Sequence, residues 1–222
     1  RMQEITGMKQ SNMAEPDGRL EMKFIGITGG VGAGKSEILS YLKKQQNIRV
    51  MLADEIAHEL MEPDGACYEK LKELFAGDAV FGADGKIERN RMAEVIFSDA
   101  AKREKLNDIV HPAVKTYVME RVKKEREKKE LRVLVLEAAL LIEEEYDSIC
   151  DELWYIYTTE ENREKRLMQN RGYSKEKVAQ IFKSQLTEET YRKYCRVVID
   201  NNGTKEDAVR QVAELLKRKE YQ

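Results

Sequence analysis

Apolar residues along this chain gather into short continuous runs, and longer segments between the runs carry them at helical spacing. The runs lie at residues 24–28, 48–52, 131–136, 153–157 and 196–199. A continuous apolar run bounded by turn residues is typical of a strand buried on both faces, as in parallel sheets covered by helices. The pattern therefore predicts an α/β fold, with a parallel five-stranded sheet and helices on both faces.

The segments between the runs predict helices over 37–44, 55–61, 174–186, 188–194 and 205–219. The stretch 56–130 contains several apolar helical faces separated by turn signals, which predicts a helical insertion. Within it, His111-Pro112 is expected at a boundary between two helices, because proline disfavours helix at the residue before it. The mixed-charge run 121–132 is interpreted as the solvated end of a long helix.

These elements suggest a division of the chain. Residues 1–22 lack periodicity and are expected to be a flexible extension, with the domain beginning near Lys23. Residues 23–55, 131–160 and 195–222 are expected to form a nucleotide-binding core. The insertion 56–130 and residues 161–194 are expected to lie outside this core.

Composition narrows the possible partners. The 222 residues are 36% charged with a formal net charge of −2, so no basic field favours nucleic acid, and small molecules are the expected partners. Cys67, Cys150 and Cys195 have no metal-ligand spacing and are expected to be packing residues in a reducing cytoplasm. No apolar run is long enough for a membrane span, and the first residues lack a signal-peptide core. A cytoplasmic protein without membrane contact is expected.

The candidate chemistry centres on Gly29-Gly30-Val31-Gly32-Ala33-Gly34-Lys35-Ser36, which follows the first predicted strand and opens a helix. Glycines at such a turn let backbone N–H groups curl around a phosphate, and the helix dipole favours the same anion. Residues 30–36 are therefore the predicted nucleotide cradle of a P-loop protein, with Lys35 on the β- and γ-phosphates and Ser36 helping to hold Mg²⁺. The alternative is a glycine-rich turn without a ligand.

Two carboxylates are predicted at strand ends near this turn. Asp54 follows the second strand, where ligands bind in open α/β folds, so it is either a candidate base or the N-cap of the next helix. Glu137 ends the third strand, where the Walker B carboxylate of P-loop proteins lies. It could position Mg²⁺ or its water shell, or it could cap the following segment.

Positive charge accumulates after the fourth strand, at Arg163, Arg166 and Arg171. Phosphoryl transfer needs cations on the migrating group, and a mobile helical flap supplies arginine in many small kinases. The alternative is an exposed basic helix face paired with glutamates at positions 160, 161 and 164.

In order along the chain, these motifs resemble the dephospho-coenzyme A kinase family over nearly all of residues 23–216. The matching pieces are residues 27–36, Ala53-Asp54-Glu55-Ile56-Ala57-His58, residues 106–112 ending in His111-Pro112, Glu137-Ala138-Ala139-Leu140, Arg166-Leu167-Met168 with residues 172–174, Gln185, and residues 197–203. The resemblance implies transfer of the γ-phosphate of ATP, with Mg²⁺, to the ribose 3′-hydroxyl of dephospho-coenzyme A. This reaction is the last step of coenzyme A biosynthesis.

The same resemblance implies roles for individual residues. It makes Asp54 the base and the insertion 56–130 the region that receives the acceptor, and it assigns Arg166 and Arg171 to a lid formed by residues 161–194. It assigns acceptor contacts to Asp54, His58, His111, Pro112 and Leu140, and it places Asn201 and Gly203 in a loop near the adenine. Either histidine could instead be an ordinary packed or capping residue.

Four positions depart from the usual family pattern. Glu37 replaces a threonine and places an anion beside the nucleotide site, and Leu52 replaces an acidic residue, which leaves Asp54 alone. Glu137 replaces an aspartate with a longer arm. Asn170-Arg171 inverts a usual Arg-Asn order, so the arginine that reaches the phosphates stays open. Lys35, Ser36 and Asp54 remain, so an active enzyme is expected.

Two other functions fit parts of the chain. Asp200-Asn201-Asn202-Gly203 spells the Asp-x-x-Gly of GTP-dependent switches, but it follows the last strand and no Asn-Lys-x-Asp guanine motif occurs. A kinase of another small metabolite, such as a nucleoside, is the nearer alternative. The sequence leaves the oligomeric state open.

Overall fold

The five predicted strands form one sheet in this computed structural model, which describes residues 21–222. All neighbouring strands are parallel, in the order β2-β3-β1-β4-β5. The strands are β1 (Lys23–Thr28), β2 (Ile48–Leu52), β3 (Val133–Glu137), β4 (Glu152–Tyr157) and β5 (Val197–Asp200). The expected parallel five-stranded sheet is confirmed, and because its strands are parallel, their carboxyl ends share one edge.

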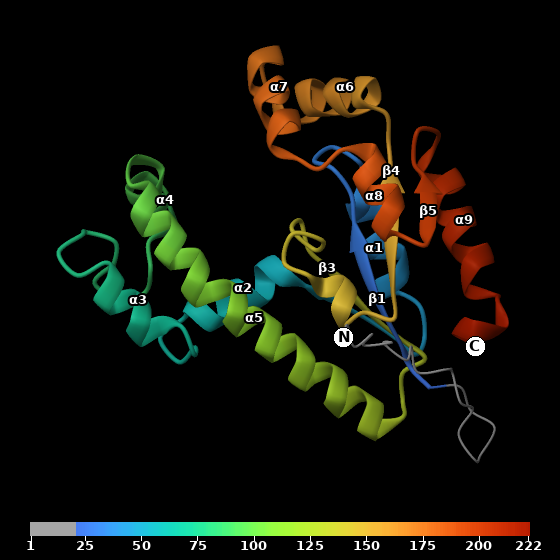
Figure 1. Ribbon diagram of the computed structural model, residues 1–222, viewed down its shortest axis with the longest axis horizontal. Helices are drawn as coiled ribbons and strands as arrows, with labels where there is room; N and C mark the ends of the chain where they lie inside the picture. Colours follow the sequence, from blue (N-terminus) through green and yellow to red (C-terminus); the bar gives the residue numbers. More distant parts are fainter. Residues whose placement is uncertain (1–20) are drawn as a thin grey trace, which may run out of the picture.

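Helices cover both faces of the sheet (Figure 1). Alternate residues of a strand point to opposite faces, so Phe24 joins one apolar cluster and Ile25 the other. The cluster around Ile25 includes residues of α1 (Lys35–Lys43) and α9 (Lys205–Leu216). The cluster around Phe24 includes residues of α2 (Ala53–Met61), α5 (Ala100–Lys128) and α8 (Glu188–Tyr194). Coverage of both faces explains why the strands read as continuous apolar runs.

The chain between β2 and β3 is helical, as predicted. It contains α2, α3 (Tyr68–Leu74), α4 (Arg89–Ser98) and α5, and a single bridge pairs Phe81 with Ile87. Figure 1 shows α3 and α4 projecting to one side of the sheet, away from α9. Within the insertion, α2 and α5 therefore pack on the sheet, while α3 and α4 extend beyond it.

The expected helix boundary at His111-Pro112 is wrong. Pro112 lies inside α5, which runs without interruption over 29 residues. Proline removes one helical hydrogen bond, but Val110, Val114 and Val118 form a buried stripe at four-residue spacing on either side of it. The stripe packs on the α2–α3 side of the core, and this packing maintains the helix through the proline.

The interpretation of residues 121–132 as a solvated helix end is also wrong in part. The side chain of Glu125 is fully buried and forms an ion pair with Arg49 of β2. Arg121 and Lys128 of the same helix also contact its carboxylate, at 3.5 and 3.4 Å. This end of α5 is therefore tied to the edge strand of the sheet.

Two further helices, α6 (Glu160–Arg171) and α7 (Lys175–Ser184), lie beyond the carboxyl ends of the strands (Figure 1). Thr159 caps α6 and Ser174 caps α7 through side-chain oxygens that accept backbone N–H groups. Short 3₁₀ turns, η1 (Tyr146–Ser148) and η2 (Lys219–Tyr221), complete the described elements. Helix α7 thus lies within the predicted range 174–186, with Ser174 as its N-cap residue.

Of the expected extension, residues 1–20 lie outside the described residues. Met22 is described and packs into the core at 4% exposure, so the packed domain includes a residue assigned to the extension. Within residues 21–222, no helix is long and apolar enough to cross a membrane. Cys67 and Cys195 are buried, and burial raises the pKa of the Cys195 thiol to about 12, which fits a packing role.

Candidate active site

The phosphate-loop motif lies at a strand-to-helix turn, as predicted. β1 ends at Thr28 and α1 begins at Lys35, with Gly34 as its N-cap residue. Gly32 and Gly34 have φ angles of +82° and +83°, in the left-handed region that glycine adopts without strain. The loop therefore curls at the amino end of α1, where backbone N–H groups and the helix dipole both favour an anion.

Lys35 lies at the base of this loop. Its Nζ donates a hydrogen bond to the Gly29 carbonyl oxygen at 2.8 Å and lies 3.8 Å from Oε1 of Glu137. Burial lowers the pKa of Lys35 and raises the pKa of Glu137, although each side chain partly offsets the shift of the other. Both charges have lost hydration here, so each would gain from a ligand of opposite charge.

Asp54 lies at the same edge of the sheet. Its helix follows β2, whose last residue, Leu52, is in register with Glu137 at the end of β3. The charge of Asp54 contributes to the pKa values of both Lys35 and Glu137, which places the three side chains in one electrostatic cluster. The N-cap alternative for Asp54 is wrong, because Leu52 is the N-cap residue and Asp54 belongs to the first turn of α2.

A cavity of about 190 Å³ opens beside Asp54. His111 of α5, Leu140 and Glu144 after β3, and Tyr146 also line it. His111 Nδ1 lies 2.8 Å from Oε1 of Glu144, so this ion pair or hydrogen bond fixes the ring at the cavity wall. Leu140 is 45% exposed and lines the cavity, so it offers an apolar surface to a ligand there.

Two of the expected acceptor residues do not line this cavity. Pro112 is exposed on α5, one position after His111, and His58 lies one helical turn after Asp54 on α2. The structure thus brings together Asp54, His111 and Leu140, but not His58 or Pro112.

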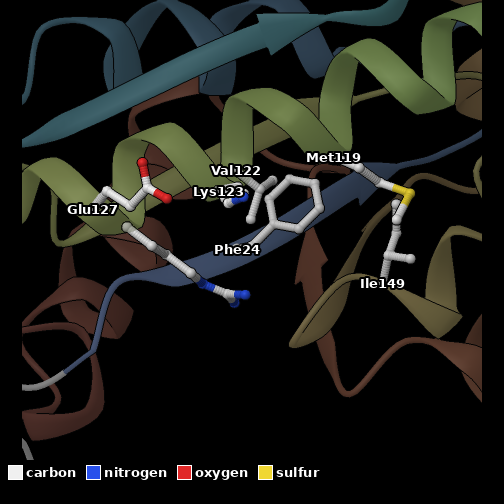
Figure 2. Close-up of a pocket in the computed structure, with 7 residues that line it drawn as sticks. Phe24, Met119, Val122, Lys123, Glu127 and Ile149 are labelled. Atoms are coloured by element: carbon white, nitrogen blue, oxygen red, sulfur yellow. The ribbon is translucent and has the colours of Figure 1, made fainter.

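A second hollow, of about 480 Å³, lies between α5 and β1. Figure 2 shows Phe24 of β1 facing Val122 and Met119 of α5. Phe24 is near the amino end of β1, whereas the phosphate loop follows its carboxyl end. This hollow is therefore distant along the strand from Lys35 and Asp54.

The three candidate arginines have different surroundings. Arg163 and Arg166 donate to backbone oxygens of the phosphate loop: Arg163 Nε to Val31 O at 2.9 Å, and Arg166 Nη1 to Ala33 O at 3.2 Å. Arg171 lies at the end of α6, with its guanidinium 5.9 Å from the ring centroid of Tyr173, and its charge lowers the pKa of Lys35. Arg171 is thus an exposed arginine, and its field, like that of the buried Arg163, reaches Lys35.

Asn201 holds the phosphate loop from the end of β5. The residue is 7% exposed, and its Nδ2 donates to Ala33 O at 2.7 Å and to Gly34 O at 3.3 Å. Arg166 Nη2 donates to the Asn201 carbonyl oxygen at 2.6 Å. Gly203 follows in the exposed part of the same turn. Sequence reasoning placed Asn201 near the nucleotide but missed its contacts with the loop backbone.

Glu37, which brings an anion to the first turn of α1, has a cationic partner. Its Oε1 lies 2.6 Å from Nζ of Lys205, at the start of α9. Because both side chains are well exposed, the pair contributes little to stability. It does offset the negative charge beside the nucleotide cradle.

Among residues 21–222, no three His, Cys, Asp or Glu side chains are grouped to hold a metal ion. Mg²⁺ usually needs only one or two protein ligands when phosphates and water complete its shell. The exposed Ser36 hydroxyl in the first turn of α1 and the Glu137 carboxylate fit that incomplete donor set. The residues present therefore fit a Mg²⁺ ion that arrives with a nucleotide.

Comparison with known proteins decides the family. A family model described as dephospho-CoA kinase (CoaE) matches residues 23–207. A dephospho-CoA kinase of Listeria monocytogenes is 36% identical over 198 residues, covering 88% of this chain and 96% of the relative. One from Shouchella clausii is 34% identical over 192 residues, covering 86% of this chain and 96% of the relative. This chain belongs to the dephospho-CoA kinase family.

Solved structures show the same fold. A crystal structure from Thermus thermophilus has a TM-score of 0.72 and 31% identity, covering 88% of this chain and 97% of that chain. A dephospho-CoA kinase from Campylobacter jejuni has a TM-score of 0.65 at 21% identity, which supports the fold alone. As a member of the dephospho-CoA kinase family, the chain is a phosphotransferase, and the Asp-x-x-Gly at residues 200–203 does not make it a GTP-dependent switch.

Proposed function

We propose that this protein transfers the γ-phosphoryl group of ATP to the ribose 3′-hydroxyl of dephospho-CoA, giving CoA. One observation carries the proposal beyond family membership: Lys35 and Asp54 share a sheet edge beside the cavity that His111 and Leu140 line. A donor on the glycine turn and an acceptor in the cavity would meet between these two side chains. Positioning of this kind is the main requirement of phosphoryl transfer.

The donor nucleotide binds through the turn at residues 30–36. Its phosphate oxygens accept hydrogen bonds from backbone N–H groups at the amino end of α1. Their negative charge also neutralises the ammonium group of Lys35, which burial has stripped of water. Ser36 and Glu137 would hold Mg²⁺, which would screen the phosphate charge when bound. Asn201 and Gly203 belong to the turn that would border the adenine, and the Glu37–Lys205 pair leaves no net charge beside it.

The acceptor binds against the insertion, residues 56–130. Leu140 offers it an apolar contact, His111 a fixed polar one, and Asp54 accepts the proton of the attacking hydroxyl. Residues 161–194 act as the lid through α6 and α7, which lie beyond the strand ends and bring the charge of Arg171 within range of Lys35, while α8 packs on the sheet. Closure over the phosphates would keep water from taking the phosphoryl group. We expect the enzyme to act in the cytoplasm.

The test is an acceptor screen with ATP and Mg²⁺ on the wild type and Asp54→Asn. Dephospho-CoA should be phosphorylated and nucleosides ignored. Asp54→Asn should bind ATP normally and turn over at least ~10²-fold more slowly, the usual contribution of a placed base. Glu55→Gln is the matched control, because Glu55 is the neighbouring exposed carboxylate on α2.

Turnover of a nucleoside in preference to dephospho-CoA would replace the proposed acceptor. Equal turnover by the Asp54 and Glu55 variants would remove Asp54 from the mechanism.

A further inference from the structure

Val31, at the outer bend of the phosphate loop, is held through both of its backbone polar groups by side chains from α6 and α7. Its carbonyl oxygen accepts a hydrogen bond from Arg163 Nε at 2.9 Å. Its N–H donates to Oε1 of Gln185 at 3.3 Å, and Gln185 is the residue that ends α7. The peptide groups on both sides of Val31 are therefore directed toward these helices.

Arg163 and Gln185 are also bonded to each other. Arg163 Nη2 donates to the same Gln185 oxygen that accepts the Val31 N–H. The guanidinium stacks on the ring of Phe182, 4.3 Å from its centroid, and Arg163 as a whole is 8% exposed. One closed set of hydrogen bonds thus joins the loop, α6 and α7, and its arginine is held in place by burial and stacking.

The glycines of the loop make this contact possible. A Cβ at Gly30 would collide with the guanidinium of Arg163, and a Cβ at Gly32 would lie 3.1 Å from the Arg163 carbonyl oxygen. Gly30 has no positive φ, so its small size matters here for the space that it leaves. Arg163 therefore occupies the space beside the loop that a side chain at Gly30 would take.

We infer that Arg163 and Gln185 are positioning residues that clip the phosphate loop to α6 and α7 and fix the direction of the N–H groups that receive a nucleotide. Arg163 donates through Nε to Val31 O and through Nη2 to Gln185, so these two donors are used in holding the loop, whereas Arg171 is exposed. Because the clip includes the last turn of α7, it also links the loop to the proposed lid. The inference rests on the proposed binding of ATP at residues 30–36.

The test is calorimetric titration with ATP and Mg²⁺ in the absence of any acceptor, on Gln185→Ala, Arg163→Ala and the double variant. Loss of the shared oxygen should weaken ATP binding about tenfold, the effect of losing one hydrogen bond to a charged group. Gln180→Ala is the matched control, because Gln180 is an exposed glutamine on the same helix. The double variant should be little weaker than either single one, since both remove the same clip.

Steady-state kinetics then separate positioning from general damage. Gln185→Ala should raise KM for ATP and leave KM for dephospho-CoA unchanged, with a melting temperature close to that of Gln180→Ala. ATP binding by Gln185→Ala as tight as by the control would overturn the inference. So would an equal loss of affinity for both substrates, which a purely structural role predicts. A wild type that binds no ATP would instead refute the proposed function.

Discussion

Gly34, where the phosphate loop passes into α1, allows two costs of substitution to be measured separately. An alanine there must adopt φ near +83°, and its Cβ must also displace Nδ2 of Asn201. Gly77 provides the comparison, because its φ is +89° and an added Cβ would meet nothing within 4 Å. Gly34→Ala therefore combines backbone strain with the loss of the Asn201 contacts, and Gly77→Ala has the strain alone.

The magnitudes follow from these contacts. Left-handed backbone costs a residue with a Cβ about 1–2 kcal/mol, which is the full effect expected for Gly77→Ala. Displacing Asn201 loses its hydrogen bonds to Ala33 O and Gly34 O, of 2.7 and 3.3 Å. At about 1 kcal/mol for each hydrogen bond, added to the backbone strain, the free energy of unfolding of Gly34→Ala should fall by roughly 3–4 kcal/mol.

Urea denaturation of the wild type, Gly34→Ala and Gly77→Ala measures the difference in unfolding free energy between the two variants. Equal m-values check that only stability has changed. ATP titration should find binding lost in Gly34→Ala and unchanged in Gly77→Ala, because only Gly34 belongs to the phosphate loop. Equal unfolding free energies for the two variants would refute the reasoning. They would mean that Asn201 moves aside without loss and does not hold the loop.

Two further predictions concern buried carboxylates. Burial raises the pKa of Glu137, so ionising it destabilises the fold, and this cost develops as pH rises from the ordinary glutamate pKa through the raised one. Glu137→Gln should remove that pH dependence and raise the melting temperature of the ligand-free protein at neutral pH. The same variant should bind Mg²⁺-ATP more weakly. A lower stability than the wild type at pH 7 would contradict this prediction. Glu125→Ala should lower the unfolding free energy by about 2–3 kcal/mol, since its cationic partners can regain water. Glu127 is exposed on the same helix, so Glu127→Ala should change the unfolding free energy by less than about 0.5 kcal/mol. If Glu125→Ala lowers the unfolding free energy no more than Glu127→Ala does, the buried ion pair contributes nothing.

Local patterns were sufficient to predict the sheet and the position of the loop. Strands buried on both faces read as continuous apolar runs, and the glycine turn occurs between one such run and an amphipathic helix. The parallel arrangement then places Asp54 and Glu137 at the edge that carries Lys35. These inferences need no knowledge of which distant side chains meet.

The errors come from contacts between distant segments. The rule that proline ends a helix considers only the backbone near Pro112. It takes no account of the valine stripe that packs α5 on the core. A charged run is usually solvated, but Glu125 meets Arg49 from a strand 76 positions earlier. Arg163 is one of three similar arginines in the sequence, and only the fold shows that it donates a hydrogen bond to Val31 O. Such pairings have no local signal.

The hydrogen bonds between Asn201 and the phosphate loop have a consequence for the translation of this chain. Asn201 lies 168 positions after Ala33, whose carbonyl oxygen it holds, so the phosphate loop is completed by a segment that is translated much later than the loop itself. A chain still emerging from the ribosome can build β1 and α1 early but lacks this partner until β5 has left the exit tunnel. Nucleotide affinity should therefore appear only once β5 has emerged, rather than when the glycine-rich turn itself is made.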